Sequence, residues 1–165
     1  MHAERLTHAD IPLYIDIRRR MLADSPVAFL PSPSEDRNLD PEYLAQAMAS
    51  GDPAIFGIRE HDRLLASARV TRQPLAKRAH VALIMGVFVD PAARGRGMGE
   101  CIINACVQHA RTLGGVTQVQ LSVSSGSPAA QRLYQRLGFV AWGTEREATR
   151  VDGCWYDEIH MVLRL

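Results

Sequence analysis

The sequence predicts an α/β domain in which strands and helices alternate along the chain. The chain has 165 residues, which suits one domain at roughly 100–200 residues per domain. It is 47% hydrophobic and 22% charged, a composition typical of a globular protein. Segments with alternating apolar residues are interleaved with segments of helical spacing, without an internal repeat or a linker. We therefore expect one domain over residues 1–165.

Hydrophobic periodicity divides the first half of the chain into two helices followed by three strands. Ile11, Tyr14 and Leu22 recur at helical spacing after Thr7, a suitable N-cap. The segment 81–89 is apolar on both alternating faces, which is typical of a strand covered on both sides. Gly86 within it predicts a bulge or a close backbone approach. The expected elements are helices over about 9–23 and 41–50 and strands over 54–60, 64–72 and 81–89.

Residues 24–40 form the longest expected loop, with three prolines and mainly acidic charges. At about 15 residues, this loop exceeds what a connection needs. Two interpretations remain open. It is either a solvated loop, or a lid or wall of an acceptor site, in which case its acidic character favours a cationic acceptor.

The second half of the chain begins with a turn rich in glycine and arginine and continues with strands and helices. An apolar stripe follows the turn at helical spacing and stops at Gly114 and Gly115. Pro128 stands at the first turn of the next helix, and Gly138 ends it. The expected elements are helices over about 98–113 and 128–137 and strands over 116–123, 139–150 and 154–165.

Composition excludes several classes of protein. The net charge of +1 argues against bulk binding to nucleic acid or to an anionic membrane. The longest apolar run, 81–89, is less than half of a membrane-spanning helix, and the first residues lack the apolar core of a signal peptide. Three cysteines without a CxxC pair favour neither disulfides nor a zinc site. We expect a cytoplasmic protein without a metal.

The densest chemical signal is the turn Arg94-Gly95-Arg96-Gly97-Met98-Gly99. Glycines let backbone N–H groups approach a ligand closely, and the start of the following helix adds partial positive charge. These features predict a site for a phosphate or pyrophosphate. A dinucleotide fingerprint would need glycine where Glu100 or Ile102 stands, and no Gly-Lys-Ser/Thr triplet of a P-loop occurs.

Two motifs resemble those of the GNAT superfamily of acetyl-CoA-dependent N-acetyltransferases. Arg94, Gly97 and Gly99 match its pattern Arg/Gln-x-x-Gly-x-Gly/Ala. The segment 130–139 is similar to its pattern Ala-x-x-Leu-Tyr-x-x-x-Gly-Phe. The resemblance implies a central twisted, mostly antiparallel sheet of about seven strands flanked by about four helices.

The resemblance also implies a binding site for acetyl-CoA as co-substrate. The strand backbone at Val87 to Val89 would pair with the pantetheine arm, the glycine turn would hold the pyrophosphate, and Tyr134 would be the general acid for the leaving thiolate. Ser127 stands where the family often has asparagine. The implied cofactor-binding residues are Val87, Phe88, Val89, Arg94, Gly95, Arg96, Gly97, Met98, Gly99, Glu100, Ser127 and Tyr134.

The chemistry also needs a way to deprotonate the acceptor. With a lysine-like pKa of about 10.4, only about 1 in 2,500 amine molecules is neutral at pH 7, so we expect a general base or a water chain. Many family members carry a glutamate on the strand that here reads Ala82 to Gly86. His80, Asp157 and Glu158 are the remaining candidates for a base. Asp157 or Glu158 could line the acceptor site, but adjacent strand residues alternate faces, so at most one is expected to point inward.

The sequence therefore favours an N-acetyltransferase that acts on a primary amine of a small molecule, protein or peptide. The alternative is a non-catalytic acyl-CoA-binding sensor. Trp142 and Trp155 are expected to pack within the closing hairpin, with an acceptor pocket or a subunit contact as the alternative. Together with Tyr156, these residues lead us to expect a homodimer through the closing strands.

Overall fold

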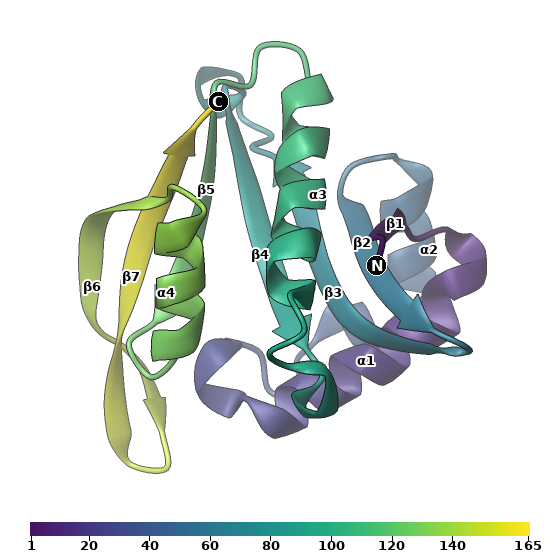
Figure 1. Cartoon of the computed structure of the whole chain (residues 1–165), viewed down its shortest axis with the longest axis horizontal. Helices are drawn as coiled ribbons and strands as arrows, with labels where there is room; N and C mark the ends of the chain where they lie inside the picture. The colour runs from purple at the N-terminus through teal and green to yellow at the C-terminus, as the bar shows by residue number, and fades with distance from the viewer.

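A seven-stranded sheet in the order β1-β2-β3-β4-β5-β7-β6 forms the centre of the computed structural model, which describes residues 1–165 (Figure 1). Neighbouring strands are antiparallel, except for the parallel pair β4–β5. The strands are β1 (Glu4–Arg5), β2 (Ala54–Glu60), β3 (Arg63–Arg72), β4 (Val81–Val89), β5 (Gln118–Ser124), β6 (Val140–Val151) and β7 (Cys154–Arg164).

Four helices cover the two faces of this sheet (Figure 1). They are α1 (Ile11–Asp24), α2 (Pro41–Ala49), α3 (Met98–Thr112) and α4 (Pro128–Arg136). One apolar cluster packs α3 and α4 against the sheet through residues such as Ile102 and Tyr134, and a second packs α1 and α2 through Ile17, Met21 and Leu44. No helix is long and apolar enough to cross a membrane.

The arrangement confirms the predicted fold class and most element boundaries. The first helix begins with a 3-10 turn, η1 (His8–Asp10), where the Thr7 N–H and hydroxyl donate to Asp10 Oδ2 at 2.7 and 2.9 Å. The sequence analysis missed β1, because two residues are too few to show alternation. The expected loop 24–40 holds two single turns, η2 (Pro26–Ala28) and η3 (Arg37–Leu39). Two further turns, η4 (Ala76–Arg78) and η5 (Pro91–Ala93), flank β4.

The parallel pair β4–β5 is joined along only part of its length. Val81 to Leu83 of β4 pair with Gln118 to Gln120 of β5, and the later residues of both strands do not pair with each other. The two strands thus separate toward their C-terminal ends. This divergence opens the sheet at one edge of the core and leaves the backbone of β4 free on that side.

The predicted irregularity at Gly86 is a β-bulge. In the β3–β4 ladder, Arg69 pairs with Met85 and Ser67 pairs with Phe88, so β4 carries an extra residue between them. Gly86 has φ +63°, a conformation that side chains disfavour. A Cβ at this position would also lie 3.4 Å from Arg18 Nη1. The bulge re-aims the backbone of β4 just before the strand reaches the glycine turn.

Candidate functional site

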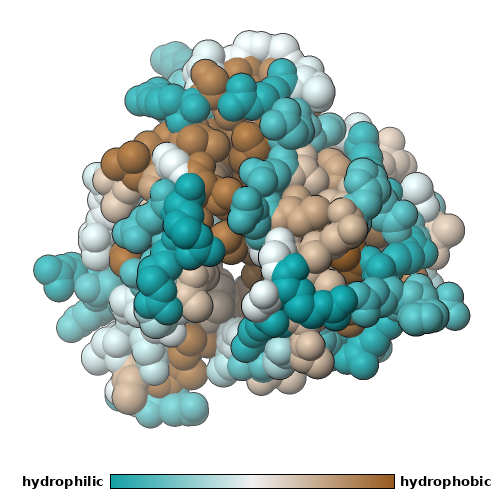
Figure 2. Space-filling view, viewed as in Figure 1, coloured by the Kyte–Doolittle hydropathy of each residue, from teal (hydrophilic) through white to brown (hydrophobic).

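A cleft of about 740 Å³ lies where β4 and β5 diverge. Figure 2 shows the molecule hollowed between the half that carries α3 and the half that carries α4. Its volume is within the usual range for ligand sites, about 300–1,000 Å³. The walls come from the ends of α1 and β4, the glycine turn and the starts of α3 and α4. The lining residues that the sequence analysis had selected are Val87, Phe88, Val89, Arg94, Gly95, Gly97, Met98, Gly99, Glu100, Ser127 and Tyr134.

The glycine turn presents unused backbone donors to this cleft. No N–H group from Gly95 to Glu100 donates a hydrogen bond to another atom of the protein. Gly95 and Gly97 have φ +78° and +79°, and a Cβ on either would meet nothing within 4 Å. Gly97 is also the N-cap of α3, whose partial positive charge favours anions. The turn therefore fits a phosphate group that approaches the backbone closely.

The side-chain position of Gly99 faces α4 and not the open cleft. A Cβ at this position would lie 2.8 Å from Leu133 Cδ2, so the Leu133 side chain would have to move. The start of α3 thus lies close to α4, which carries Tyr134.

The two arginines of the turn have different surroundings. The side chain of Arg94 lines the cleft, where its Nε donates to the Val89 carbonyl at 3.1 Å and its Nη2 pairs with Asp24. The side chain of Arg96 pairs with Glu60 of β2, and Arg96 is absent from the cleft walls. Of these two arginines, only Arg94 lines the cleft, which Arg136 of α4 also lines.

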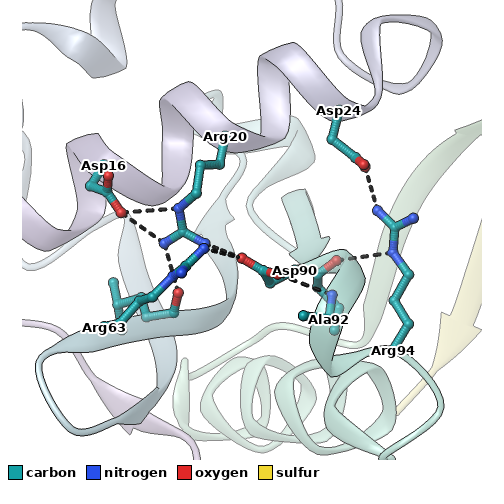
Figure 3. A network of polar contacts seen from close by, with 9 residues as sticks. Asp16, Arg20, Asp24, Arg63, Asp90, Ala92 and Arg94 are labelled. Atoms are coloured by element: carbon teal, nitrogen blue, oxygen red, sulfur yellow. Dashed lines mark hydrogen bonds and ion pairs between the residues drawn. The ribbon is translucent and has the colours of Figure 1, made fainter.

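Asp90 fixes the junction between β4 and the turn (Figure 3). Its side chain is buried, and its carboxylate accepts hydrogen bonds from Arg20, from Arg63 at 2.9 Å and from the Ala92 N–H at 3.1 Å. Burial opposes ionisation, but the Ala92 N–H and the Arg20 guanidinium hold the pKa of Asp90 below its usual range. Sequence reasoning missed this contact. The charged residues at positions 16, 20 and 24, spaced one helical turn apart, were a signal that one side of α1 meets a charged partner.

Tyr134 lies on α4 and borders the cleft while being 5% exposed. Its ring packs against Phe139 with the ring centroids 6.1 Å apart. Burial raises the pKa of the Tyr134 hydroxyl above its ordinary value. The hydroxyl therefore stays protonated at neutral pH and can donate a hydrogen bond or a proton within the cleft.

A second, smaller cavity of about 20 Å³ adjoins the cleft. Both cavities are bordered by Val27, Ala28 and Phe29, so this short segment separates them. Asp157 and Glu158 both border the small cavity, although alternation along a strand predicted that only one could face the site. The difference has a local cause, since the β6–β7 register skips from Glu145 to Thr149 and leaves Asp157 opposite no single residue of the β6 ladder.

The two carboxylates differ in how they are engaged. Asp157 Oδ1 accepts from the Glu147 N–H at 2.9 Å, and Arg146 lies 3.4 Å from Oδ2. The Glu158 side chain makes no hydrogen bond or ion pair within the protein. His80 is exposed at the other end of β4 from the glycine turn and borders neither cavity. The structure thus brings Asp157 and Glu158 near the cleft and does not bring His80 there.

The comparison with protein families places these features in context. Residues 17–139 match the model of the acetyltransferase (GNAT) family, which covers both motifs and the cleft between them. The chain belongs to the GNAT acetyltransferase family. The matched residues include the glycine turn, the bulged strand β4 and the helix that carries Tyr134.

Relatives and solved structures agree with this membership. The chain is 35% identical over 94 residues to a mycothiol acetyltransferase of Thermobispora bispora, a match that spans 55% of this chain and 32% of the relative. A second mycothiol acetyltransferase, from Streptosporangium roseum, is 42% identical over 59 residues, 36% of this chain and 17% of that relative. The chain thus spans a third or less of the length of these relatives.

The fold is shared with GNAT structures at low sequence identity. The Salmonella typhimurium protein yncA, solved with acetyl-CoA, superimposes with a TM-score of 0.86 at 20% identity over 100% of this chain and 94% of its own. A ribosomal-protein-alanine N-acetyltransferase of Brucella melitensis superimposes with a TM-score of 0.84 at 19% identity over the whole of both chains. At this identity, the likeness establishes the fold.

Proposed function

We propose that this protein transfers the acetyl group of acetyl-CoA directly to a primary amine of a small molecule, protein or peptide. One observation carries the proposal. One cleft is lined by the free N–H groups of the glycine turn, by the part of β4 that does not pair with β5 and by the protonated Tyr134. These groups are what a phosphate, an extended amide-containing arm and a leaving thiolate respectively require.

Each part of the cleft has a role in this proposal. The N–H groups from Gly95 to Glu100, with Arg94, would hold the pyrophosphate. The backbone of β4 at Val87 to Val89 would pair with the pantetheine arm as a neighbouring strand does, next to Ser127 at the start of α4. Acetyl-CoA supplies an activated acyl group. An N–H of the bulged strand near Phe88 would donate to the carbonyl oxygen, where negative charge develops during attack.

Proton movements fall to two side chains. Tyr134 would donate its hydroxyl proton to the departing thiolate, since burial keeps that hydroxyl protonated. The amine must lose a proton as its nitrogen bonds to the carbonyl carbon. Glu158 is the better placed acceptor for this proton, because its carboxylate is unengaged whereas Asp157 is held by Glu147. Both would line the acceptor site beside Ser124 and Thr149.

The proposal is tested by following the release of free thiol from acetyl-CoA across a panel of amines and peptide N-termini. We expect turnover with at least one primary amine and saturable binding of CoA. Binding of CoA without turnover on any amine would instead support the acyl-CoA sensor. No binding of CoA would refute both.

We also propose that the chain is a single domain that forms a homodimer in the cytoplasm through the β6–β7 hairpin. Trp142 and Trp155 are 59% and 55% exposed, although their rings contact side chains of the hairpin. Trp142 stacks on His160, and Arg150 lies over the ring of Trp155. β6 is also an edge strand of the sheet. Exposed aromatic residues beside an unpaired strand edge favour contact with a second copy.

A further inference from the structure

Residues 25–35, here named the strap, connect α1 to Asp36 and include η2. In Figure 1 this segment leaves the end of α1 and passes toward the half of the molecule that carries β6 and β7. Residues of η2 contact both β5 and β6, so the strap crosses the open end of the cleft. Val27, Ala28 and Phe29 within it form the wall shared by the cleft and the small cavity.

The strap has no hydrogen bond to the sheet, to α3 or to α4. Its hydrogen bonds join strap residues to one another, to Asp36 or to residues of α1. The side chains across the cleft contact it through apolar packing, such as the edge-on Phe29–Phe88 pair with ring centroids 6.5 Å apart. This packing, together with Arg18 over the Phe29 ring and the ion pairs at its two ends, holds the strap in place.

These two ion pairs differ in burial. Asp36 pairs with Arg18 at 2.5 Å, and the two side chains are 1% and 7% exposed. Asp24 pairs with Arg94, and these side chains are 26% and 51% exposed. Removing either partner of a buried pair leaves an uncompensated charge, whereas an exposed pair contributes little and exchanges partners easily. The end at Asp36 is thus fixed, and the end at Asp24 can be released.

The releasable pair uses an arginine that lines the cleft beside the glycine turn. Asp24 pairs with Arg94 (Figure 3), and both residues line that cleft. The Ser25 hydroxyl and the Arg94 guanidinium hold the pKa of Asp24 below its usual range, so Asp24 is ionised at neutral pH. A pyrophosphate at the glycine turn would bring further negative charge next to this carboxylate. Phosphate oxygens are strong partners for a guanidinium and would compete for it.

We propose that Asp24 and the pyrophosphate of acetyl-CoA compete for Arg94, so that cofactor binding releases the strap at the acceptor cavity. This inference rests on the proposed function. Asp24 is then a positioning residue that holds the cavity wall in the free protein. Its negative charge lowers the affinity of the phosphate site, and the occupied phosphate site frees Val27 to Phe29 to move beside Asp157 and Glu158.

The first test measures the binding of CoA by calorimetry to the full chain and to Asp24→Asn. We expect the variant to bind CoA about two- to fivefold more tightly, the range set by loss of one exposed competing ion pair. Asp16→Asn is the matched control. Asp16 is, like Asp24, an α1 aspartate paired with an arginine, but its partner is Arg20 and Asp16 does not line the cleft. The control should bind CoA as the parent does.

The second test follows hydrogen exchange of the strap amides with and without CoA. In the parent, CoA should accelerate exchange in residues 25–35. In Asp24→Asn, exchange should already be fast and CoA should change it little. Equal or weaker binding of CoA by Asp24→Asn, or no response of the strap to CoA in the parent, would overturn the inference. A parent that binds no CoA would overturn the proposed function itself.

Discussion

Replacing Gly97 with valine isolates the role of the glycine turn. Gly97 has φ +79°, and the space beside its Cα is empty for 4 Å. The valine methyl groups would occupy the space in which a phosphate approaches the free N–H groups of Gly95 to Glu100. Hydrogen bonds to charged groups contribute about 1.5–3 kcal/mol each. Loss of two such bonds should weaken CoA binding by at least about 100-fold.

The substitution also strains the backbone, so a matched control is essential. Gly115 has φ +81° and nothing within 4 Å of a Cβ, but it lies after the other end of α3 and outside the cleft. Valine at either position should cost about 1–3 kcal/mol of folding free energy. For a chain of this size, each kcal/mol lowers Tm by about 2–4 °C. Both variants should thus lose similar thermal stability.

The two variants should differ only in ligand binding, measured by calorimetry with CoA on protein shown to be folded by thermal denaturation. Gly115→Val should bind CoA as the parent does, and Gly97→Val should not bind it measurably. Unchanged CoA affinity in folded Gly97→Val would refute the assignment of the phosphate site. Equal loss of affinity in both variants would show that strain, and not the blocked space, is responsible.

Four further predictions concern catalysis, stability and assembly. Tyr134→Phe should lower kcat by about 10²–10⁴-fold and leave CoA affinity within about twofold, and a kcat within twofold of the parent would make Tyr134 a packing residue. Asp36→Asn should destabilise the fold by about 3–5 kcal/mol in chemical denaturation, whereas the double variant Arg18→Met/Asp36→Asn should recover much of that loss because no charge remains buried alone. Burial opposes ionisation of Asp36, but hydrogen bonds from Arg18 and Asn38 hold its pKa low. The stabilisation from ionised Asp36 is therefore present above its unfolded pKa of about 3.9 and disappears as the pH falls through the lower folded value. A free energy of unfolding of the parent that does not fall in acid would contradict this. Sedimentation at high micromolar concentration should give twice the mass of one 18.3 kDa chain, and the mass of a single chain would exclude the dimer.

The parts of the site that lie on a continuous stretch of sequence were predictable. The spacing of Arg94, Gly97 and Gly99 after an apolar strand specifies a turn and a helix start, because positive φ and close backbone approach restrict residue choice locally. Gly86 indicated its bulge for the same reason. Element types followed from periodicity, and the fold class followed from their order.

Contacts between distant segments were not predictable in the same way. Asp90 is 70 residues from Arg20 in sequence, and nothing local to either residue indicates that they meet. The pairing of Asp24 with Arg94 depends equally on how α1 lies across the sheet. His80 seemed a reasonable base on its strand, but only the direction of β4 shows that it lies at the end away from the turn. The exposure of Trp142 and Trp155 depends on which strand forms the edge of the sheet.

Two carboxylates act at the two ends of η5, the single turn between β4 and the glycine turn: Asp90 precedes η5, and Asp24 pairs with Arg94, which follows it. Their surroundings give them different roles. Asp90 is 7% exposed and receives hydrogen bonds from two arginines and one backbone N–H. Displacing any of these donors would leave a buried charge poorly compensated, so this contact keeps the backbone of the turn in one conformation. Asp24 is more exposed and pairs with one arginine, itself half exposed. In the proposed cycle, the pyrophosphate would therefore take over Arg94 while the N–H groups of the glycine turn stay in place, because the rigid and the exchangeable contacts are made by separate residues.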